Sequence, residues 1–272
     1  MRGKKIAISG KGGVGKSTVA ALWALQFARE GDKVIAIDAD PDANLTHALG
    51  MPQEVRRQIM PLASHTALIE ERTGAKAGRS GQMFSLTPKV DDIAAQYGIA
   101  YRGVHTIVLG AIRKGGGGCA CPESSLLKSL VRHLVLNENE TVVLDMEAGV
   151  EHIGRATAAG VDSLVVVTEA GSRSLETAMR IHELARDIGL DTKMTLLLNK
   201  VRDSGDDQPR RLSQLLPDVP VIGSIPFDER LIECDEAGTS LLDRTDSDPL
   251  LDLFNRARKN LAVLMENGFN SR

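Results

Sequence analysis

Short apolar runs alternate with longer amphipathic stretches along most of the chain. Six runs are almost continuously apolar and rich in β-branched residues, which is typical of strands buried on both faces of a parallel sheet: residues 4–9, 33–38, 141–146, 163–169, 194–200 and 219–225. Helical spacing of apolar residues predicts helices over 16–30, 124–137, 175–188, 209–216 and 249–266. This alternation predicts an α/β fold with a doubly wound, mostly parallel sheet flanked by helices.

The section between about residues 50 and 118 is less regular than the rest. Residues 82–86 and 105–110 have the composition of strands and could extend the sheet, while residues 113–118 form a glycine-rich run. A chain of 272 residues is long enough for one large α/β core. Because the sequence shows no internal repeat, no long linker and no second core pattern, we expect residues 1–272 to form a single domain.

Composition argues against several classes of function. Aromatic residues make up 3% of the chain and the net charge is −3, so the sequence lacks the stacking residues and basic surface of a typical nucleic-acid reader. No apolar run reaches the roughly 18 residues that span a membrane, and the N-terminus lacks the apolar segment of a signal peptide. Three cysteines do not form a disulfide framework. We therefore expect a cytoplasmic protein with neither nucleic acid nor membrane as a partner.

Residues 10–17 match the pattern G-x-x-x-x-G-K-[ST] of a phosphate-binding loop, between a predicted strand and a predicted helix. Glycines let such a loop turn its N–H groups towards phosphate oxygens, and the helix that follows adds the partial positive charge of its N-terminus. Lys16 is expected to bridge the β- and γ-phosphates of ATP, and the Ser17 hydroxyl to bind Mg²⁺. The predicted nucleotide contacts in this loop are Gly12, Gly13, Val14, Gly15, Lys16, Ser17 and Thr18.

A second lysine, Lys11, follows the first glycine of this loop. The stretch KGGVGKST resembles the deviant phosphate loop of the nitrogenase iron protein, MinD and ParA group, in which the second lysine crosses a dimer interface to the nucleotide of the other subunit. The resemblance implies a P-loop NTPase of the deviant Walker A dimer class. Such a protein is a Mg²⁺-dependent homodimer that hydrolyses ATP to ADP and phosphate, with catalytic roles for Lys11 and Lys16.

Two acidic stretches follow predicted strands. The stretch DADPDAN, residues 38–44, resembles the first switch of these ATPases, where a carboxylate orients the attacking water and helps to hold Mg²⁺. The resemblance gives this catalytic role to Asp40. Asp145 ends an apolar run, where a strand-terminal Asp holds the Mg²⁺ shell, and residues 145–149 resemble the second switch. Taken alone, each Asp could instead be a helix cap or a turn residue. The expected Mg²⁺ ligands are Ser17, Asp40 and Asp145.

The base of the nucleotide is expected near two later strand ends. Asn199-Lys200 ends a predicted strand and resembles the position of the base-contacting Asn in these ATPases. Pro226-Phe227-Asp228 follows the next strand and resembles the loop that packs against adenine. Pro226 also stiffens a tight turn, and that role alone could explain its presence.

Cys119-Ala-Cys121 follows the glycine-rich run. A C-x-C pair supplies two thiolates, whereas a closed metal site usually has four ligands. In a two-fold dimer, two such loops can meet at the axis and supply four thiolates together. Four sulfurs suit Zn²⁺, an Fe–S cluster or a square-planar ion such as Ni²⁺; the alternative is a pair of incidental thiols. The third cysteine, Cys234, is expected to be a small buried residue.

The order GKGGVGKST, DADPDANL, C-A-C and DMEAGVEH resembles the CooC family over essentially the whole chain. These ATPases deliver nickel to the active-site cluster of carbon monoxide dehydrogenase. The resemblance implies an ATP-dependent metallochaperone that holds Ni²⁺, with Zn²⁺ possible in the same site, on Cys119 and Cys121 of two subunits. Its client would be apo carbon monoxide dehydrogenase or a related Ni–Fe–S enzyme. Glu147, Glu151 and His152 lie beside the second switch and are given no ligand role.

Two other functions fit parts of the sequence. The first is an ATP-dependent Fe–S electron-transfer protein like the nitrogenase iron protein, but residues 148–155 contain no cysteine where that protein has one after its second switch. The second is a MinD- or ParA-like positioning ATPase. The last helix would then bind lipid, yet residues 254–269 form a diluted amphipathic pattern that suits packing against the sheet better.

Overall fold

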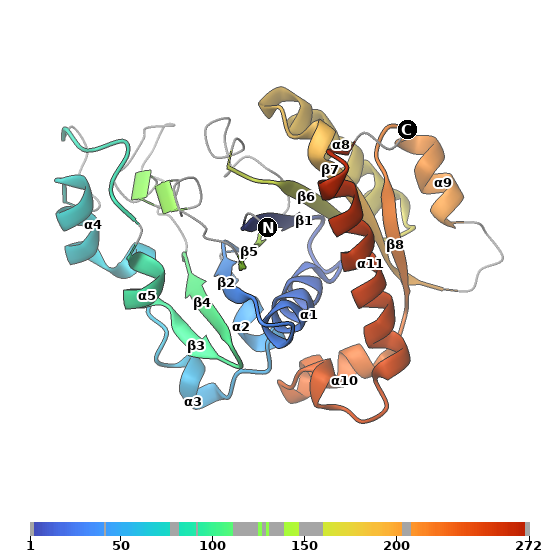
Figure 1. The fold of residues 1–272 in the computed structure, drawn as a ribbon, viewed down its shortest axis with the longest axis horizontal. Helices are drawn as coiled ribbons and strands as arrows, with labels where there is room; N and C mark the ends of the chain where they lie inside the picture. The colour runs from blue at the N-terminus through green and yellow to red at the C-terminus, as the bar shows by residue number, and fades with distance from the viewer. Residues whose placement is uncertain are drawn as a thin grey trace.

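The computed structural model describes residues 3–40, 42–76, 82–90, 92–110, 125–126, 129–130, 139–146, 160–202 and 208–269. These residues form an eight-stranded sheet in the order β3-β4-β2-β5-β1-β6-β7-β8 (Figure 1). The strands are β1 (Lys4–Ser9), β2 (Lys33–Asp38), β3 (Ile99–Tyr101), β4 (Val104–Val108), β5 (Glu140–Asp145), β6 (Ser163–Thr168), β7 (Met194–Val201) and β8 (Val221–Pro226). Only β3 runs antiparallel to its neighbour, so the expected α/β fold with a mostly parallel sheet is confirmed.

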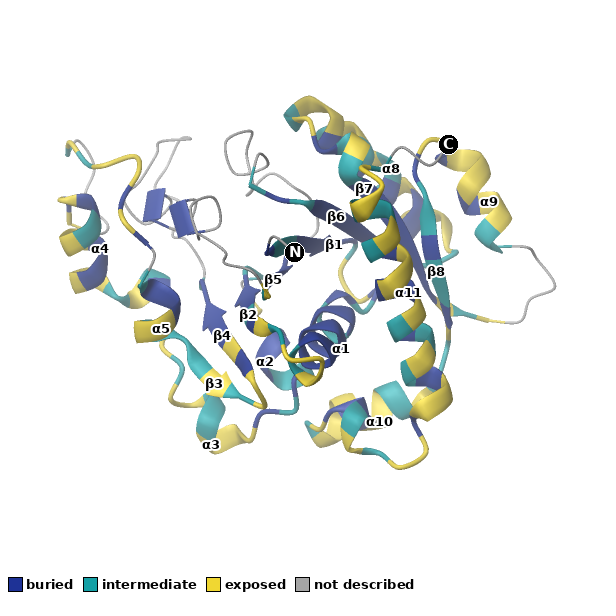
Figure 2. Cartoon of the chain, viewed as in Figure 1, coloured by how far each residue is buried: buried dark blue, intermediate teal, exposed yellow. Residues whose placement is uncertain are grey.

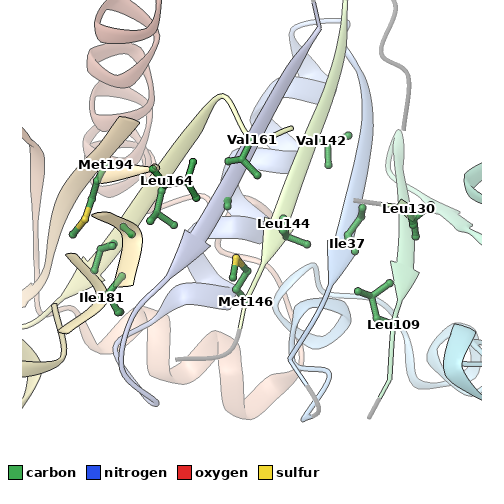
Figure 3. Close-up of a cluster of buried hydrophobic side chains, with 14 of the residues drawn as sticks. Ile37, Leu109, Leu130, Val142, Leu144, Met146, Val161, Leu164, Ile181 and Met194 are labelled. Carbon is green, nitrogen blue, oxygen red and sulfur yellow. The ribbon is translucent and has the colours of Figure 1, made fainter. Parts of the chain in front are cut away.

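Helices cover both faces of this sheet. They are α1 (Lys16–Arg29), α2 (Leu45–Ala48), α3 (Gln53–Arg56), α4 (Thr66–Thr73), α5 (Ile93–Tyr97), α8 (Ser172–Ile188), α9 (Gln208–Leu215), α10 (Glu229–Ala237) and α11 (Asp248–Glu266). One core cluster joins the sheet to α1, α2, α10 and α11, and a second joins it to α4, α5, α8 and α9. Figure 3 shows part of the second cluster, in which Ile37 of β2 and Leu144 of β5 lie on the face of the sheet that is covered by α8 with its Ile181.

Helix α1 is buried along most of its length, as its dark blue ribbon in Figure 2 shows. It is apolar on nearly all sides because it lies between the sheet, α2 and α11. The only tryptophan of the chain, Trp23, is fully buried in it and donates its indole N–H to the Phe254 carbonyl of α11 at 3.1 Å. This packing fixes the helix whose N-terminus follows the phosphate loop.

The apolar runs predict the main strands within one or two residues at most ends. All six primary runs form strands, and the run at 105–110 forms β4. The helices expected at 16–30, 175–188, 209–216 and 249–266 are α1, α8, α9 and α11. The helix expected over 124–137 lies mostly outside the described residues, although residues 125–126 and 129–130 are helical.

The prediction of a strand at residues 82–86 is wrong. These residues form no strand, and Met83 and Leu86 are 96% and 69% exposed. The edge of β4 that an added strand could use is already paired with β3, which joins it through the tight turn at Arg102 and Gly103. A three-residue strand has too few alternating positions to stand out in a sequence.

Candidate nucleotide and magnesium site

The phosphate loop connects the end of β1 to the start of α1 at the carboxyl edge of the sheet. Gly10, Gly13 and Gly15 have φ values of +146°, +81° and +96°, conformations that other residues adopt only with strain. Lys16 is 6% exposed, and its ammonium contacts the Lys11 carbonyl at 3.4 Å. The loop therefore has the left-handed backbone expected of a phosphate cradle, followed directly by the N-terminus of a buried helix.

Lys11 and Thr18 flank the centre of this loop and are both half-buried. The Lys11 carbonyl accepts bonds from within the loop, but its ammonium makes no hydrogen bond or ion pair within the ranges described above. Nothing in this part of the chain therefore fixes the Lys11 side chain, and the role predicted for it across a dimer interface stays a prediction.

Asp38 and Asp145 end the neighbouring strands β2 and β5 and are register partners. Both are fully buried. The Asp38 carboxylate accepts the backbone N–H of Asp40 at 3.2 Å and that of Leu45 at 2.9 Å, and so holds the start of the predicted first switch. Burial, and then the charge of Asp145, raise the pKa of Asp38 to about 7, although these two N–H groups lower it. The switch motif gives its role to Asp40 and none to Asp38, yet Asp38 ends an apolar run just as Asp145 does.

Asp145 has fewer hydrogen-bond partners than Asp38. Neither of its oxygens has a hydrogen-bond partner of ordinary geometry in the described part of the chain. Burial raises the pKa of Asp145 to about 6, against the opposing effects of the Ser17 hydroxyl and the Lys16 ammonium. The negative charge of half-buried Asp40 also raises the pKa of Asp145. Ser17 therefore lies beside Asp145, and Asp40 is near enough for its charge to act on that carboxylate, while its own carboxylate accepts the Asp42 N–H. Unpartnered carboxylate oxygens beside a hydroxyl fit the oxygen ligands that Mg²⁺ prefers.

Asn199 and Lys200 end β7 close to the phosphate loop. Asn199 is 2% exposed and donates its side-chain N–H to the Val14 carbonyl at 2.8 Å, while its amide oxygen is buried without a partner among the described residues. The Lys200 ammonium donates to the Gly13 carbonyl. Both side chains thus use their N–H groups to contact the loop itself. The Asn199 oxygen is the atom still available for the base, and that contact stays a prediction.

The three residues predicted to pack against the base lie at the end of β8. Pro226 is exposed, and the Phe227 ring is covered by the Arg202 guanidinium, whose carbon lies 4.2 Å from the ring centroid. Asp228 is the N-cap of α10 and accepts bonds from the backbone and guanidinium of Arg230, which lower the pKa of its carboxyl. Its contacts here are those of a helix cap, and Arg202 is a neighbour that the sequence did not point to.

The predicted metal cysteines Cys119 and Cys121 lie outside the described residues, as do Glu147, Glu151 and His152. Within the described ranges, no group of three or more His, Cys, Asp or Glu side chains is arranged to hold a metal ion. Cys234 is 6% exposed in α10, and burial raises the pKa of its thiol, as expected of a small core residue. Across the same ranges, no helix is long and apolar enough to cross a membrane.

The fold and the phosphate loop define the class of this protein: it is a P-loop ATPase that binds ATP or ADP with Mg²⁺. The family model of the CobQ/CobB/MinD/ParA nucleotide binding domain matches residues 5–241. The carbon monoxide dehydrogenase accessory protein CooC of Rhodospirillum rubrum is 44% identical over 239 residues, which are 88% of this chain and 89% of that protein. An uncharacterized ATP-binding protein of Methanocaldococcus jannaschii is 40% identical over 92% of this chain and 96% of its own length.

Solved structures of lower identity show the same fold. A ParA family ATPase from Chlorobium tepidum superposes with a TM-score of 0.70 at 18% identity, covering 96% of this chain and 98% of the other. MinD from Pyrococcus horikoshii, solved with Mg-ADP, gives 0.63 at 19% identity and 98% coverage of each chain. The chain belongs to the CobQ/CobB/MinD/ParA nucleotide-binding family and, within it, to the group of CooC. The resemblance that the motifs suggested is thereby confirmed.

Proposed function

We propose that this protein is a cytoplasmic, ATP-dependent metallochaperone that binds nickel between the two subunits of a homodimer and delivers it to carbon monoxide dehydrogenase or a related Ni–Fe–S enzyme. The observation that carries the proposal is the 44% identity, over 88% of the chain, to a protein described as a carbon monoxide dehydrogenase accessory protein. The C-x-C pair supports it, because thiolates are suitable ligands for a soft or borderline ion.

The dimer completes the metal site in this proposal. One chain contributes the two thiolates of Cys119 and Cys121, and a two-fold axis between subunits doubles them to four. The same axis brings the Lys11 ammonium of each subunit to the nucleotide of the other. An ammonium with no partner in the described part of its own chain is suited to that contact.

Within each subunit, the proposed work is divided among the residues at the carboxyl edge of the sheet. Lys16 and the loop N–H groups bind the phosphates, and Asp40 orients the attacking water. Ser17, Asp40 and Asp145 hold Mg²⁺, which, when bound, neutralises charge on the phosphates. The Asn199 amide oxygen accepts a hydrogen bond from the base, and the residues at 226–228 pack beside it. Nickel is the cargo of this cycle and is not consumed by it.

The experiment is anaerobic equilibrium binding of Ni²⁺ with the oligomeric state measured on the same samples, with and without nucleotide. We expect one Ni²⁺ per wild-type dimer and at least about a 100-fold weaker affinity in Cys119→Ala/Cys121→Ala, because a four-thiolate site loses all of its sulfurs. Cys234→Ala is the matched control: this thiol is buried in α10, so its removal should leave nickel binding unchanged.

Nickel binding that survives the double substitution would remove the C-x-C pair from the site. An iron–sulfur chromophore in protein purified without oxygen would favour the electron-transfer function instead. The protein could bind neither Ni²⁺ nor an iron–sulfur cluster, and Cys119→Ala/Cys121→Ala could still replace the wild type in cells. A positioning or regulatory ATPase would then become the working hypothesis.

A further inference from the structure

Lys200 joins three separate parts of the chain at the carboxyl edge of the sheet. Its ammonium donates to the Gly13 carbonyl at 2.5 Å and lies 3.1 Å from a carboxylate oxygen of Glu169. Glu169 follows β6, whereas Lys200 belongs to the neighbouring strand β7. Glu169 belongs to none of the sequence motifs of the site, and its side chain is half-buried, with 36% exposed.

The backbone of Lys200 is held in a conformation that lysine seldom adopts. Its φ is +54°, in the left-handed region, and the pairing of β7 with β8 shifts register between Leu198 and Val201. Such strain persists where the surrounding structure fixes it, and it gathers at functional sites. The Lys200 side chain therefore makes its contacts from a point where the strand departs from regular geometry.

Asn199 and Lys200 hold two consecutive carbonyl groups of the phosphate loop. Asn199 binds the Val14 carbonyl at 2.8 Å, and Lys200 binds the Gly13 carbonyl. The fit is close, because a Cβ on Gly15 would lie 2.5 Å from the Asn199 side-chain nitrogen. These two bonds are made from side chains about 185 residues away in sequence, so they reflect tertiary structure and not local turn geometry.

Fixing a carbonyl also fixes the N–H of the next residue. The C=O and N–H of a trans peptide point in opposite directions, so the two bonds aim the N–H groups of Val14 and Gly15 away from β7. The Val14 N–H has only a long bond of 3.4 Å, to the Lys11 carbonyl. N–H groups at these positions of a phosphate loop are the ones that bind phosphate oxygens.

We infer that Lys200, held in place by Glu169, is a positioning residue that sets the orientation of the phosphate loop. It acts on the nucleotide through the Gly13–Val14 peptide and does not touch the base. Its effect should therefore be equal for ADP and ATP, which share the phosphates bound by this part of the loop. Because the Lys200 and Glu169 side chains are 40% and 36% exposed, solvent screens the ion pair, and the charge-assisted bond to Gly13 contributes more than the ion pair itself.

The test measures the Kd of ADP and of ATP by calorimetry, and kcat and KM with Mg²⁺. Lys200→Met should weaken both nucleotides about tenfold and change kcat by less than about threefold. Lys200→Gly should give the same loss; it accepts the positive φ without strain, so it separates the ammonium from the backbone. Glu169→Gln should weaken binding about threefold, and Glu169→Gln/Lys200→Met should be no weaker than Lys200→Met alone.

Lys193→Met is the matched control, because the Lys193 ammonium also donates to a backbone carbonyl, that of Val161 at 2.9 Å, just before the start of β7. It should leave nucleotide affinity unchanged. The preference for ATP over GTP should also be unchanged in Lys200→Met, whereas a base contact would lower it. The inference is overturned if Lys200→Met and Lys200→Gly bind ADP within twofold of the wild type, or if the Lys193 variant loses as much affinity.

Discussion

Asp145→Asn should lower the kcat of ATP hydrolysis by at least about 100-fold and, at about pH 8, stabilise the nucleotide-free protein against unfolding by about 2 kcal/mol. The two effects have one cause. Asp145 is fully buried, and neither carboxylate oxygen has a hydrogen-bond partner of ordinary geometry in the described ranges. A buried charge with incomplete hydrogen bonding destabilises a folded protein, and the Ser17 hydroxyl and the Lys16 ammonium offset only part of this effect. The charge is kept because it lies where the proposed magnesium site needs it.

The stability part of this prediction depends on pH. The pKa values of Asp38 and Asp145 in the folded protein, about 7 and about 6, lie above the value of about 3.9 for Asp in an unfolded chain. Between these values the folded protein binds more protons than the unfolded chain, so the contribution of this pair to the free energy of unfolding falls as the pH rises. This loss of stability is absent below about pH 4 and complete by about pH 8, one unit above the pKa of Asp38.

Asp145→Asn removes one titrating group and also the charge that helps to raise the pKa of Asp38. The variant should therefore gain more stability over the wild type at about pH 8 than at about pH 5. The measurement is urea unfolding of the nucleotide-free protein at both pH values, monitored by the fluorescence of Trp23. It is paired with a steady-state ATPase assay at saturating Mg²⁺.

Asp162→Asn is the control for this experiment. The Asp162 carboxylate is already partnered, because it accepts the backbone N–H of Lys5 at 2.8 Å, at the edge of the sheet opposite the phosphate loop. Its replacement should neither stabilise the protein nor change kcat. An Asp145→Asn protein that is less stable than the wild type at pH 8, or that keeps kcat within tenfold, would contradict the prediction.

The two buried acids also show what the sequence can and cannot predict about this site. Asp145 is predicted because it ends an apolar run, and that signal depends only on local residues. Asp38 ends a similar run, but its importance comes from the pairing of β2 with β5, which sets it beside Asp145. Strand order is a tertiary property, and no spacing in the chain encodes it. The sequence therefore identifies the switch segment but gives its role to Asp40 alone.

The end of β7 shows the same limit. The Asn199-Lys200 pair is recognisable in the sequence, and its position at a strand end is predicted correctly. That both side chains bind carbonyls of the phosphate loop depends on how far β7 lies from β1, with only β6 between them. The fold, by contrast, is largely predictable, because buried parallel strands and amphipathic helices each leave a strong periodic signal. Short edge elements such as β3 leave none.

Gly10→Ala should cost more than about 3 kcal/mol of stability, or prevent folding altogether, although it adds one methyl group. The Cβ would lie 2.1 Å from the Val167 carbonyl oxygen and 3.1 Å from its carbon, and the φ of Gly10 is +146°. Both obstacles are backbone features. Val167 belongs to β6, which pairs directly with β1 just before Gly10, so the two strands would have to separate inside the core.

Gly12→Ala is the matched control for stability, two residues further along the same loop. No heavy atom lies within 4 Å of a Cβ at Gly12, and Gly12 is exposed. Its replacement should change the free energy of unfolding by less than about 0.5 kcal/mol, the range expected of a surface substitution. The comparison uses urea unfolding of both variants without nucleotide, so effects on phosphate binding do not enter. A Gly10→Ala protein within about 1 kcal/mol of the wild type would show that β1 and β6 can move apart at the loop, and that the phosphate cradle does not depend on the close contact between them.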